Sequence, residues 1–430
     1  MTQGDIGDFI LDHTVKGMPG GIAPFRLGDI GRQGWNVLRE DLPLPLAVLK
    51  ESALTHNGSW MRRFLEESGA VIAPHGKTTM SPQLFDRQMQ DGAWAITVAT
   101  AHQIQVAREF GFQRIVLANQ LVGRQAIRYV LEELRRDPGF DFYCLADSTA
   151  NVRRLAEAAQ AAGLNRPLQL LLEGGFAGGR TGCRSVAAAL EVARAIGTSG
   201  NRLVLRGVEG FEGLSRGASP EDSEKQVADF LDFLVEIAAS CEAEGLFAPG
   251  PIILSAGGSK YYDIVAARFR QAKLGRETLV VTRSGCYLTH DSILYRQAFE
   301  RLAQRSPELG HLGTGLLPAL ELWAYVQSRP EPTKALLTLG KRDISYDDLP
   351  VALKWLRPGE SKPSPMPPGH LVTGLNDQHC HMTLPADSPL AVGDMVCFGM
   401  SHPCLTFDKW QVIGVVDDDY NLVSAVRTFF

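Results

Sequence analysis

Long apolar runs, an excess of basic residues and a regular cysteine spacing are all missing from this sequence of 430 residues. No apolar stretch approaches the roughly 18 residues that a membrane-spanning helix needs, so we expect no membrane partner. The first ten residues, MTQGDIGDFI, contain no basic segment and no apolar core, and we therefore expect no signal peptide. The formal net charge of −5 lacks the positive excess typical of nucleic-acid-binding proteins, so we expect no nucleic-acid partner.

Cysteine is scarce, and the odd count in a chain of this size does not indicate a disulfide framework. We expect a reducing, cytoplasmic environment. The hydrophobic fraction of 45% and the charged fraction of 21% are ordinary for a globular protein, and the length suits two or three domains. The seven cysteines are Cys144, Cys183, Cys241, Cys286, Cys380, Cys397 and Cys404.

What the sequence does contain is a recurring unit of a short apolar run, a turn and an amphipathic stretch. Each run is short and apolar enough to be a strand buried on both faces. Ser81-Pro82 and Ser219-Pro220 are typical first residues of the helices between the runs. Eight such alternations favour an α/β fold, a (β/α)8 barrel of the TIM type, although an open doubly wound sheet would show the same alternation. The runs are 45–49, 70–73, 95–98, 114–118, 141–146, 168–173, 203–208 and 251–255.

The pattern changes after residue 276. Segments typical of strands, such as 395–398 and 412–416, are separated by stretches rich in proline and glycine, notably 357–369. We therefore expect the barrel to span residues 41–275. A mostly β domain would comprise residues 276–430 together with residues 1–40, which do not fit the alternating pattern.

Lys77 is the first candidate for chemistry, because it follows the apolar run 70–73 in the segment Pro74-His75-Gly76-Lys77-Thr78. Active sites of such barrels lie at the carboxyl ends of their strands. We expect neighbouring apolar strands to desolvate this lysine partly, which would lower its pKa and free the amine for imine chemistry. A surface lysine in an ordinary loop is the competing interpretation.

Two glycine-rich segments follow later apolar runs. Gly257 and Gly258, with Ser259, precede an amphipathic stretch, and their backbone N–H groups are suited to hold a phosphate. Arg180 lies in the glycine-rich segment 174–182, where it could hold a phenolate, a carboxylate or a phosphate. A plain turn and a solvated loop charge are the competing interpretations of these two segments.

Candidate metal ligands lie near the C-terminus. His402 and Cys404 follow the apolar run 395–400, and an imidazole and a thiolate two residues apart in a strand would lie on the same side. Both groups suit Zn²⁺ and would leave positions open for water or substrate. A second dense segment, 377–381, contains His379, Cys380 and His381, of which one could be a ligand beside two bystanders.

Taken in order, these motifs resemble the D-serine dehydratase and D-threonine aldolase group of fold-type III pyridoxal-phosphate enzymes. Alanine racemases share the barrel but are more distant. The resemblance runs from about residue 45 to 410, with departures at Gly76, Phe211 and Leu214 that leave the substrate open. The motifs are Ala73-Pro74-His75-Gly76-Lys77-Thr78, Gly179-Arg180-Thr181-Gly182, Ser255-Ala256-Gly257-Gly258-Ser259, Ser284-Gly285-Cys286-Tyr287, Asp377-Gln378-His379 and His402-Pro403-Cys404.

The resemblance implies a role for each motif residue. Lys77 would carry pyridoxal 5′-phosphate as a Schiff base and act as the base at Cα. His379 would take part in acid–base chemistry at the active site. His402 and Cys404 would bind a divalent metal, Zn²⁺ by preference, and a cysteine rather than an aspartate at the second position favours the dehydratase branch. The cofactor-binding residues would be Lys77, His75, Arg180, Gly257, Gly258, Ser259, Gly285 and Tyr287.

The resemblance also implies an activity: metal-assisted β-elimination of a β-hydroxy D-amino acid such as D-serine to a keto acid and ammonia. Retro-aldol cleavage to glycine and an aldehyde uses the same residues. The motifs also suit a racemase, which needs no metal, and a cofactor carrier without catalysis. We expect a homodimer.

Overall fold

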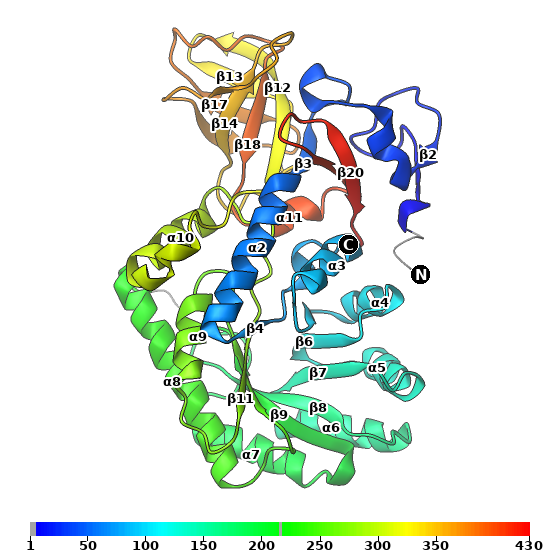
Figure 1. The fold of residues 1–430 in the computed structure, drawn as a ribbon, viewed down its shortest axis with the longest axis vertical. Coiled ribbons are helices and arrows are strands. Elements are labelled where there is room, and N and C mark those ends of the chain that lie inside the picture. The colour runs from blue at the N-terminus through cyan, green and yellow to red at the C-terminus, as the bar shows by residue number, and fades with distance from the viewer. Residues whose placement is uncertain (1–5, 215–216) are drawn as a thin grey trace. The chain divides into compact units, whose positions relative to one another are not determined.

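The structure is a computed structural model that describes residues 6–214 and 217–430. The chain divides into two units (Figure 1). The barrel unit comprises residues 62–77 and 89–285. The β unit comprises residues up to 61, residues 78–88 and residues 286–430. The chain passes from one unit to the other within α2 (Glu51–Ser68) and within α3 (Pro82–Gln90).

An eight-stranded parallel sheet forms the centre of the barrel unit, in the order β4-β11-β10-β9-β8-β7-β6-β5. Its two ends meet, because Trp94 and Thr97 donate backbone N–H groups to Ile72 O at 2.8 Å and Pro74 O at 2.9 Å. The expected α/β barrel is therefore confirmed. The strands are β4 (Val71–Ile72), β5 (Ile96–Val98), β6 (Arg114–Gln120), β7 (Asp141–Ala146), β8 (Leu168–Gly174), β9 (Leu203–Gly210), β10 (Ile252–Ala256) and β11 (Thr278–Thr282).

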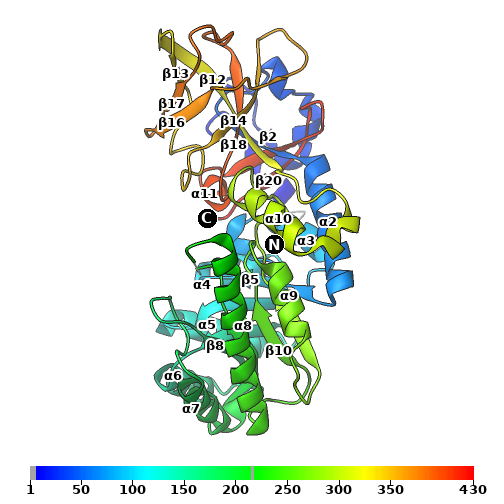
Figure 2. The same cartoon turned by 90° about the vertical axis from the view of Figure 1, so that its left-hand side faces the viewer.

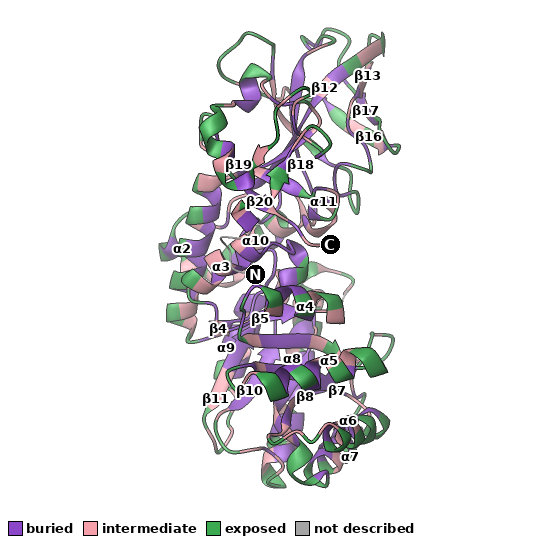
Figure 3. Cartoon of the chain, turned by 90° about the vertical axis from the view of Figure 1, so that its right-hand side faces the viewer, coloured by how far each residue is buried: buried purple, intermediate pink, exposed green. Residues whose placement is uncertain are grey.

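Helices connect successive strands of this sheet, and α8 and α9 pack side by side (Figure 2). Figure 3 shows buried strands and helices whose outer faces are exposed. The predicted helix starts are confirmed: α8 begins at Pro220, and the Ser219 hydroxyl accepts a bond from the Asp222 N–H. The connecting helices are α4 (Ala101–Glu109), α5 (Arg124–Arg136), α6 (Thr149–Ala161), α7 (Val186–Gly197), α8 (Pro220–Ala243) and α9 (Tyr262–Arg270), with 3-10 turns at η3 (Gly76–Thr78) and η4 (Gly200–Arg202).

Two strand assignments from the sequence are wrong. The run 45–49, expected as the first barrel strand, is β3 (Leu46–Lys50) and pairs with β12 and β19 of the other sheet. The eighth barrel strand is instead β11, which lies beyond the barrel boundary expected at residue 275. Both runs are short and apolar, and periodicity does not tell which distant strand such a run pairs with.

The β unit contains a ten-stranded sheet in which only β19 and β3 pair in parallel. This confirms the expected mostly β domain. Its strands besides β3 are β12 (Leu320–Glu331), β13 (Lys334–Leu337), β14 (Val351–Leu356), β15 (Ser364–Pro365), β16 (Leu371–Leu375), β17 (Cys380–Thr383), β18 (Met395–Gly399), β19 (Val412–Val416) and β20 (Leu422–Arg427). The same unit holds β1 (Ile10–Leu11), β2 (Phe25–Arg26), η1 (Leu27–Gln33), η2 (Val37–Arg39), α10 (Leu294–Arg305), η5 (Pro307–Leu312) and α11 (Cys404–Phe407).

Within the described ranges, no helix combines the length and the apolar character that crossing a membrane requires.

The barrel interior is filled by side chains from the strands and their ends. These residues lie in one apolar cluster, and each is at most 4% exposed. In an interior packed this closely, replacing one of these side chains by a smaller one leaves a cavity. The cluster consists of Ala73, Ala95, Val116, Tyr143, Leu145, Leu171, Ile253 and Val281.

We predict that Leu171→Ala destabilises the barrel unit by about 2–5 kcal/mol, since it removes buried methyl groups and leaves a cavity. Urea unfolding followed by far-UV circular dichroism measures the change. Leu371→Ala is the control, because Leu371 is 63% exposed and its loss should cost little. Equal effects of the two substitutions would contradict the packing of the barrel interior.

Candidate active site and metal centre

Lys77 lies beyond the carboxyl end of β4, in the 3-10 turn η3. Its side chain is exposed, so the expected partial desolvation is not found. The reason is local: β4 ends at Ile72, and four further residues carry the chain beyond the apolar strands before Lys77. The position at a strand end agrees with the expectation.

His75 lies two residues before Lys77 and forms a parallel bridge with Thr97. Its Nδ1 atom is buried and has no hydrogen-bond partner in the described part of the chain. Burial holds the pKa of the His75 ring well below its ordinary value, and the positive charges of Lys77, Arg283 and Arg180 lower it further. The ring is therefore neutral, and the three cations lie near enough to influence it.

Gly257 and Gly258 form a tight turn directly after β10. Gly257 has a φ of +96°, which favours glycine, and a Cβ atom on Gly258 would lie in tight contact with the Phe211 ring, at 3.1 Å. The carbonyl groups of the turn are held by the next strand end: the Arg283 N–H donates to Gly257 O at 3.0 Å and the Ser284 hydroxyl to Gly258 O at 2.9 Å. The two N–H groups are left for an anion.

The anion at these two N–H groups is the carboxylate of Glu212. Its oxygens accept the Gly257 N–H at 3.0 Å and the Gly258 N–H at 2.8 Å, and Glu212 is 0% exposed. A carboxylate here shows that the turn binds negative charge, as a phosphate site must. Ser259 follows the turn, and α9 begins three residues later, at Tyr262.

Arg180 lies in the loop between β8 and α7, with its guanidinium 4.5 Å from the centre of the Phe211 ring. The loop is anchored by Glu173 at the end of β8, which accepts a bond from the Thr181 hydroxyl at 2.7 Å and another from Gln120. Burial raises the pKa of Glu173. Arg180 is exposed, and its guanidinium packs against the Phe211 ring.

Sequence reasoning missed Arg283, Glu209 and Glu212. Arg283 forms a close ion pair with Glu209 and donates to Gly210 O at 2.8 Å. Burial raises the pKa of Glu209 to about 7, Arg283 opposes this shift, and the carboxylates of Glu173 and Glu212 add to it. Arg283 was missed because β11 was not recognised as a barrel strand. The segment Glu209–Glu212 at the end of β9 carried a signal, since acidic residues stand beside two glycines there.

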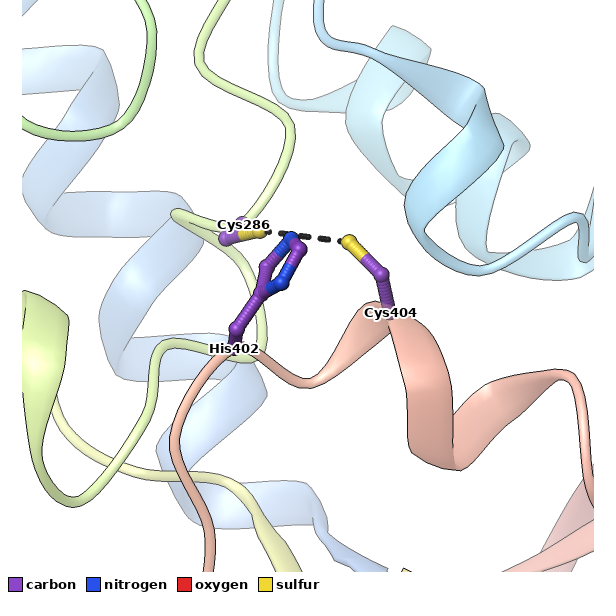
Figure 4. Close-up of side chains that lie close together, drawn as sticks. All are labelled: Cys286, His402 and Cys404. Carbon is purple, nitrogen blue, oxygen red and sulfur yellow. Dashed lines mark hydrogen bonds between the residues drawn. The ribbon is translucent and has the colours of Figure 1, made fainter. Parts of the chain in front are cut away.

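A candidate metal centre lies in the β unit, where β18 ends before the segment Ser401-His402-Pro403-Cys404. One ligand atom each from Cys286, His402 and Cys404 lies within 4.8 Å of the other two (Figure 4). The two sulfur atoms are 3.8 Å apart, and the Thr78 hydroxyl lies 3.5 Å from the Cys404 sulfur. The structure thus brings His402 and Cys404 together and adds Cys286, but the expected strand alternation is wrong here, because β18 ends at Gly399, His402 has a φ of +50° and Cys404 begins α11.

Two interactions make the side chains of this cluster suitable as metal ligands. His402 Nδ1 is 2.7 Å from an Asp347 oxygen, which leaves Nε2 as the ligand atom. The hydrogen bond with Cys404 and, to a smaller extent, the charge of His402 lower the pKa of Cys286 to about 6 despite burial. A Cys₂His set is a known Zn²⁺ ligand set that leaves a fourth position open, whereas Mg²⁺ and Ca²⁺ prefer oxygen ligands.

Of the remaining expected residues, Gly285 and Tyr287 directly flank Cys286 in the chain, whereas His379 comes from a different segment. His379 is exposed in the turn between β16 and β17, and among the described residues its imidazole makes no hydrogen bond. Gly285 is buried at the end of the barrel unit, and Tyr287 is 2% exposed in the β unit. Cys286 stands in the motif Ser284-Gly285-Cys286-Tyr287, but nothing near it in the sequence indicated a metal ligand, because His402 lies 116 positions further along the chain.

Residues 319–416 match a family model described as "Putative serine dehydratase domain". No curated protein is similar enough in sequence to match this chain. The match and the shared fold described next confirm the resemblance to fold-type III pyridoxal-phosphate enzymes that the motifs indicated.

Solved structures share the fold over most of the chain. D-threonine aldolase from Filomicrobium marinum has a TM-score of 0.74 at 19% identity, covering 94% of this chain and 98% of that one. D-threo-3-hydroxyaspartate dehydratase from Delftia sp. HT23 has a TM-score of 0.71 at 20% identity, covering 92% and 99%. An alanine racemase-like protein from Idiomarina loihiensis has a TM-score of 0.67 at 16% identity, covering 90% and 96%.

We predict that Glu209 makes the stability of the barrel unit depend on pH. Its folded pKa of about 7 lies above the ordinary value of 4.5, so its contribution is full below pH 4.5 and is lost as the pH rises through about 7. Glu209→Gln removes this dependence. The free energy of unfolding of the wild type, minus that of the variant, should fall by on the order of 2 kcal/mol between pH 5 and pH 8. Urea titrations at these pH values measure it, and a difference that stays constant would contradict the raised pKa.

Proposed function

We propose that this chain is a pyridoxal-phosphate enzyme that catalyses metal-assisted β-elimination of a β-hydroxy D-amino acid, such as D-serine, to a keto acid and ammonia. The observation that carries the proposal is the Cys286–His402–Cys404 cluster, in a chain whose barrel also presents a lysine and an anion-binding turn. A Lewis acid suits the departure of a poor leaving group such as hydroxide.

The residues of the barrel unit fit the proposed cofactor on two observations. The N–H groups of Gly257 and Gly258 already hold an anionic group, and Nδ1 of His75 is a buried polar atom without a partner among the described residues. A buried polar atom of this kind is normally bonded, which favours a ligand atom beside it. When bound, the cofactor supplies an electron sink for a carbanion at Cα.

The chain's own residues would bind, orient and move protons. The Lys77 amine would hold the cofactor covalently and accept the Cα proton of the substrate. Arg180 and Arg283 would offset negative charge near the neutral His75 ring. Neutral His75 provides a hydrogen-bonding ring nitrogen without adding a further positive charge.

Cys286, His402 and Cys404 would hold the metal, whose Lewis acidity assists loss of the β-hydroxyl group. Asp347 would keep the His402 ring oriented through its bond to Nδ1. One solved variant of the D-threo-3-hydroxyaspartate dehydratase, with a cysteine changed to alanine, is in a metal-free form. That finding in a protein of the same fold supports a cysteine ligand here.

Retro-aldol cleavage is the second candidate, because the chain shares its fold with a D-threonine aldolase. The same lysine and metal ligands would serve, and the products would be glycine and an aldehyde. A racemase needs no metal, and a cofactor carrier needs no catalytic metal site, so the three-ligand cluster favours neither. An acid–base role for His379, phosphate contacts from Ser259, Gly285 and Tyr287, a homodimer and a cytoplasmic location stay predictions.

We predict that Lys77→Ala abolishes both cofactor attachment and turnover. Purified protein with pyridoxal phosphate and Zn²⁺ is incubated with D-serine or D-threonine, and keto acid and glycine are assayed. Keto acid from the wild type, reduced at least about a thousandfold in the variant, is expected because the base and the attachment point are both lost. Lys273→Ala, an exposed lysine of the same unit, is the control.

The products separate the candidates. Glycine from D-threonine without keto acid would favour the aldolase. The absence of both products, together with no absorbance from a lysine-bound cofactor, would overturn the proposal as a whole.

We predict that the chain binds about one Zn²⁺ ion. The variants His402→Ala, Cys404→Ser and Cys286→Ser should bind this ion more weakly. Removing one of three ligands should weaken Zn²⁺ binding at least about tenfold and reduce β-elimination in parallel. Metal content and competition with a chromophoric chelator measure the affinity. Cys380→Ser is the matched control, because Cys380 is also buried in the same unit but lies outside the cluster. Full Zn²⁺ affinity in Cys286→Ser would remove Cys286 from the ligand set.

A further inference from the structure

Glu212 has an unusual place in the barrel unit, because it bonds the turn that a phosphate would be expected to use. Its two carboxylate oxygens accept from two successive N–H groups, those of Gly257 and Gly258, at 3.0 and 2.8 Å. Successive N–H groups pointing the same way make an anion-binding concavity. The Glu212 side chain is fully buried, so these hydrogen bonds form in the interior of the protein and not at its surface.

The carboxylate and a phosphate are mutually exclusive ligands of this turn. Each backbone N–H is a single donor, and a charge-assisted bond to a carboxylate is roughly twice as strong as a neutral one. The carbonyl groups of the turn offer no alternative, since carbonyl oxygens are acceptors and those of Gly257 and Gly258 already accept from Arg283 and Ser284.

Charge adds to the conflict. Glu173, Glu209 and Glu212 are three buried carboxylates, and the charges of Glu173 and Glu212 act on Glu209 together with those of Arg283 and Arg180. Arg283 is already paired with Glu209. A phosphate dianion that joined this group with Glu212 still in place would be repelled, because buried like charges interact strongly.

We propose that Glu212 competes with the phosphate group of the cofactor for the N–H groups of Gly257 and Gly258, and thereby sets how tightly the cofactor is held. This inference rests on the proposed function, since it assigns the turn to the phosphate of pyridoxal phosphate. Binding of the phosphate requires the Glu212 carboxylate to give up both bonds, and release of the phosphate restores them. Glu212 is a positioning residue that governs affinity and takes no part in bond breaking.

The test measures binding rather than turnover. The full chain, freed of cofactor with hydroxylamine, is titrated with pyridoxal phosphate, with pyridoxal and with inorganic phosphate. Absorbance of the lysine-bound form reports the first two, and calorimetry reports the third. Glu212→Gln keeps the shape but removes the charge and one acceptor oxygen. Glu212→Asp keeps the charge but is one methylene too short to reach both N–H groups.

A third variant distinguishes competition for the glycine N–H groups from charge repulsion between a buried carboxylate and the phosphate. Glu209→Gln removes a buried carboxylate from the end of the same strand and leaves the bonds of Glu212 to the glycines in place. Circular dichroism and thermal unfolding show whether each variant is folded. Because Glu212→Asp and Glu212→Gln disturb packing differently, loss of folding in one leaves the other to decide.

The expected result is that Glu212→Gln and Glu212→Asp both bind pyridoxal phosphate and inorganic phosphate about tenfold more tightly than the wild type. Pyridoxal, which lacks the phosphate, should bind within about twofold of the wild type, and Glu209→Gln should change phosphate affinity less than Glu212→Gln does. Unchanged or weaker phosphate binding by the folded Glu212 variants would overturn the inference and make Glu212 a support of the turn. If Glu209→Gln and Glu212→Gln bound phosphate more tightly but Glu212→Asp did not, the loss of negative charge would explain the tighter binding. That result would overturn competition for the N–H groups.

Failure of the proposed function looks different. In that case the wild type gives no absorbance from a lysine-bound cofactor with either pyridoxal compound, whereas inorganic phosphate still tests the competition at the turn.

Discussion

Backbone hydrogen bonds from the β5 segment to the chain beyond β4 close the parallel sheet, and the chemistry of the barrel unit depends on this closure. In a closed parallel barrel all strands end at one rim, so residues far apart in sequence become neighbours. Lys77 follows β4, Gly257 follows β10 and Arg283 follows β11. His75 shows the effect directly, because it bridges to Thr97 on one side while its pKa responds to Arg180 and Arg283 from other strand ends.

Several charged side chains are buried at this rim of the barrel. Glu209 and Arg283 are both nearly inaccessible and form an ion pair, yet burial still raises the pKa of Glu209 to about 7. A pair of this kind gives little net stability, since desolvation offsets much of the attraction. The pair instead holds Arg283 at the strand end, where it also donates to the Gly210 carbonyl. Glu212 is also buried, and it satisfies the N–H groups of Gly257 and Gly258.

The sequence predicted what is local and missed what is distant. Lys77, the glycine pair and the His402–Cys404 pair each lie in a short motif after an apolar run, and the structure places them after strands as expected. The run 45–49 was expected in the barrel, but β11 is the barrel strand and the run belongs to the other sheet. Apolar character predicts that a strand is buried, but it does not predict which strand it pairs with. That one error concealed Arg283. Cys286 joins His402 across 116 residues, and no spacing rule foretells such a contact.

Two of the points at which the chain passes between units fall inside the functional motifs. Lys77 closes one segment of the barrel unit and Thr78 opens one of the β unit, while Gly285 and Cys286 form the second such junction. Thr78 and Cys286 both contact the Cys404 sulfur, so each junction supplies a residue beside the candidate metal ligands. Lys77 and Gly285 precede them by one peptide bond, which fixes the separation of neighbouring Cα atoms at about 3.8 Å. Residues that a sequence motif places side by side therefore belong to different units, and a motif does not show which unit each of its side chains serves.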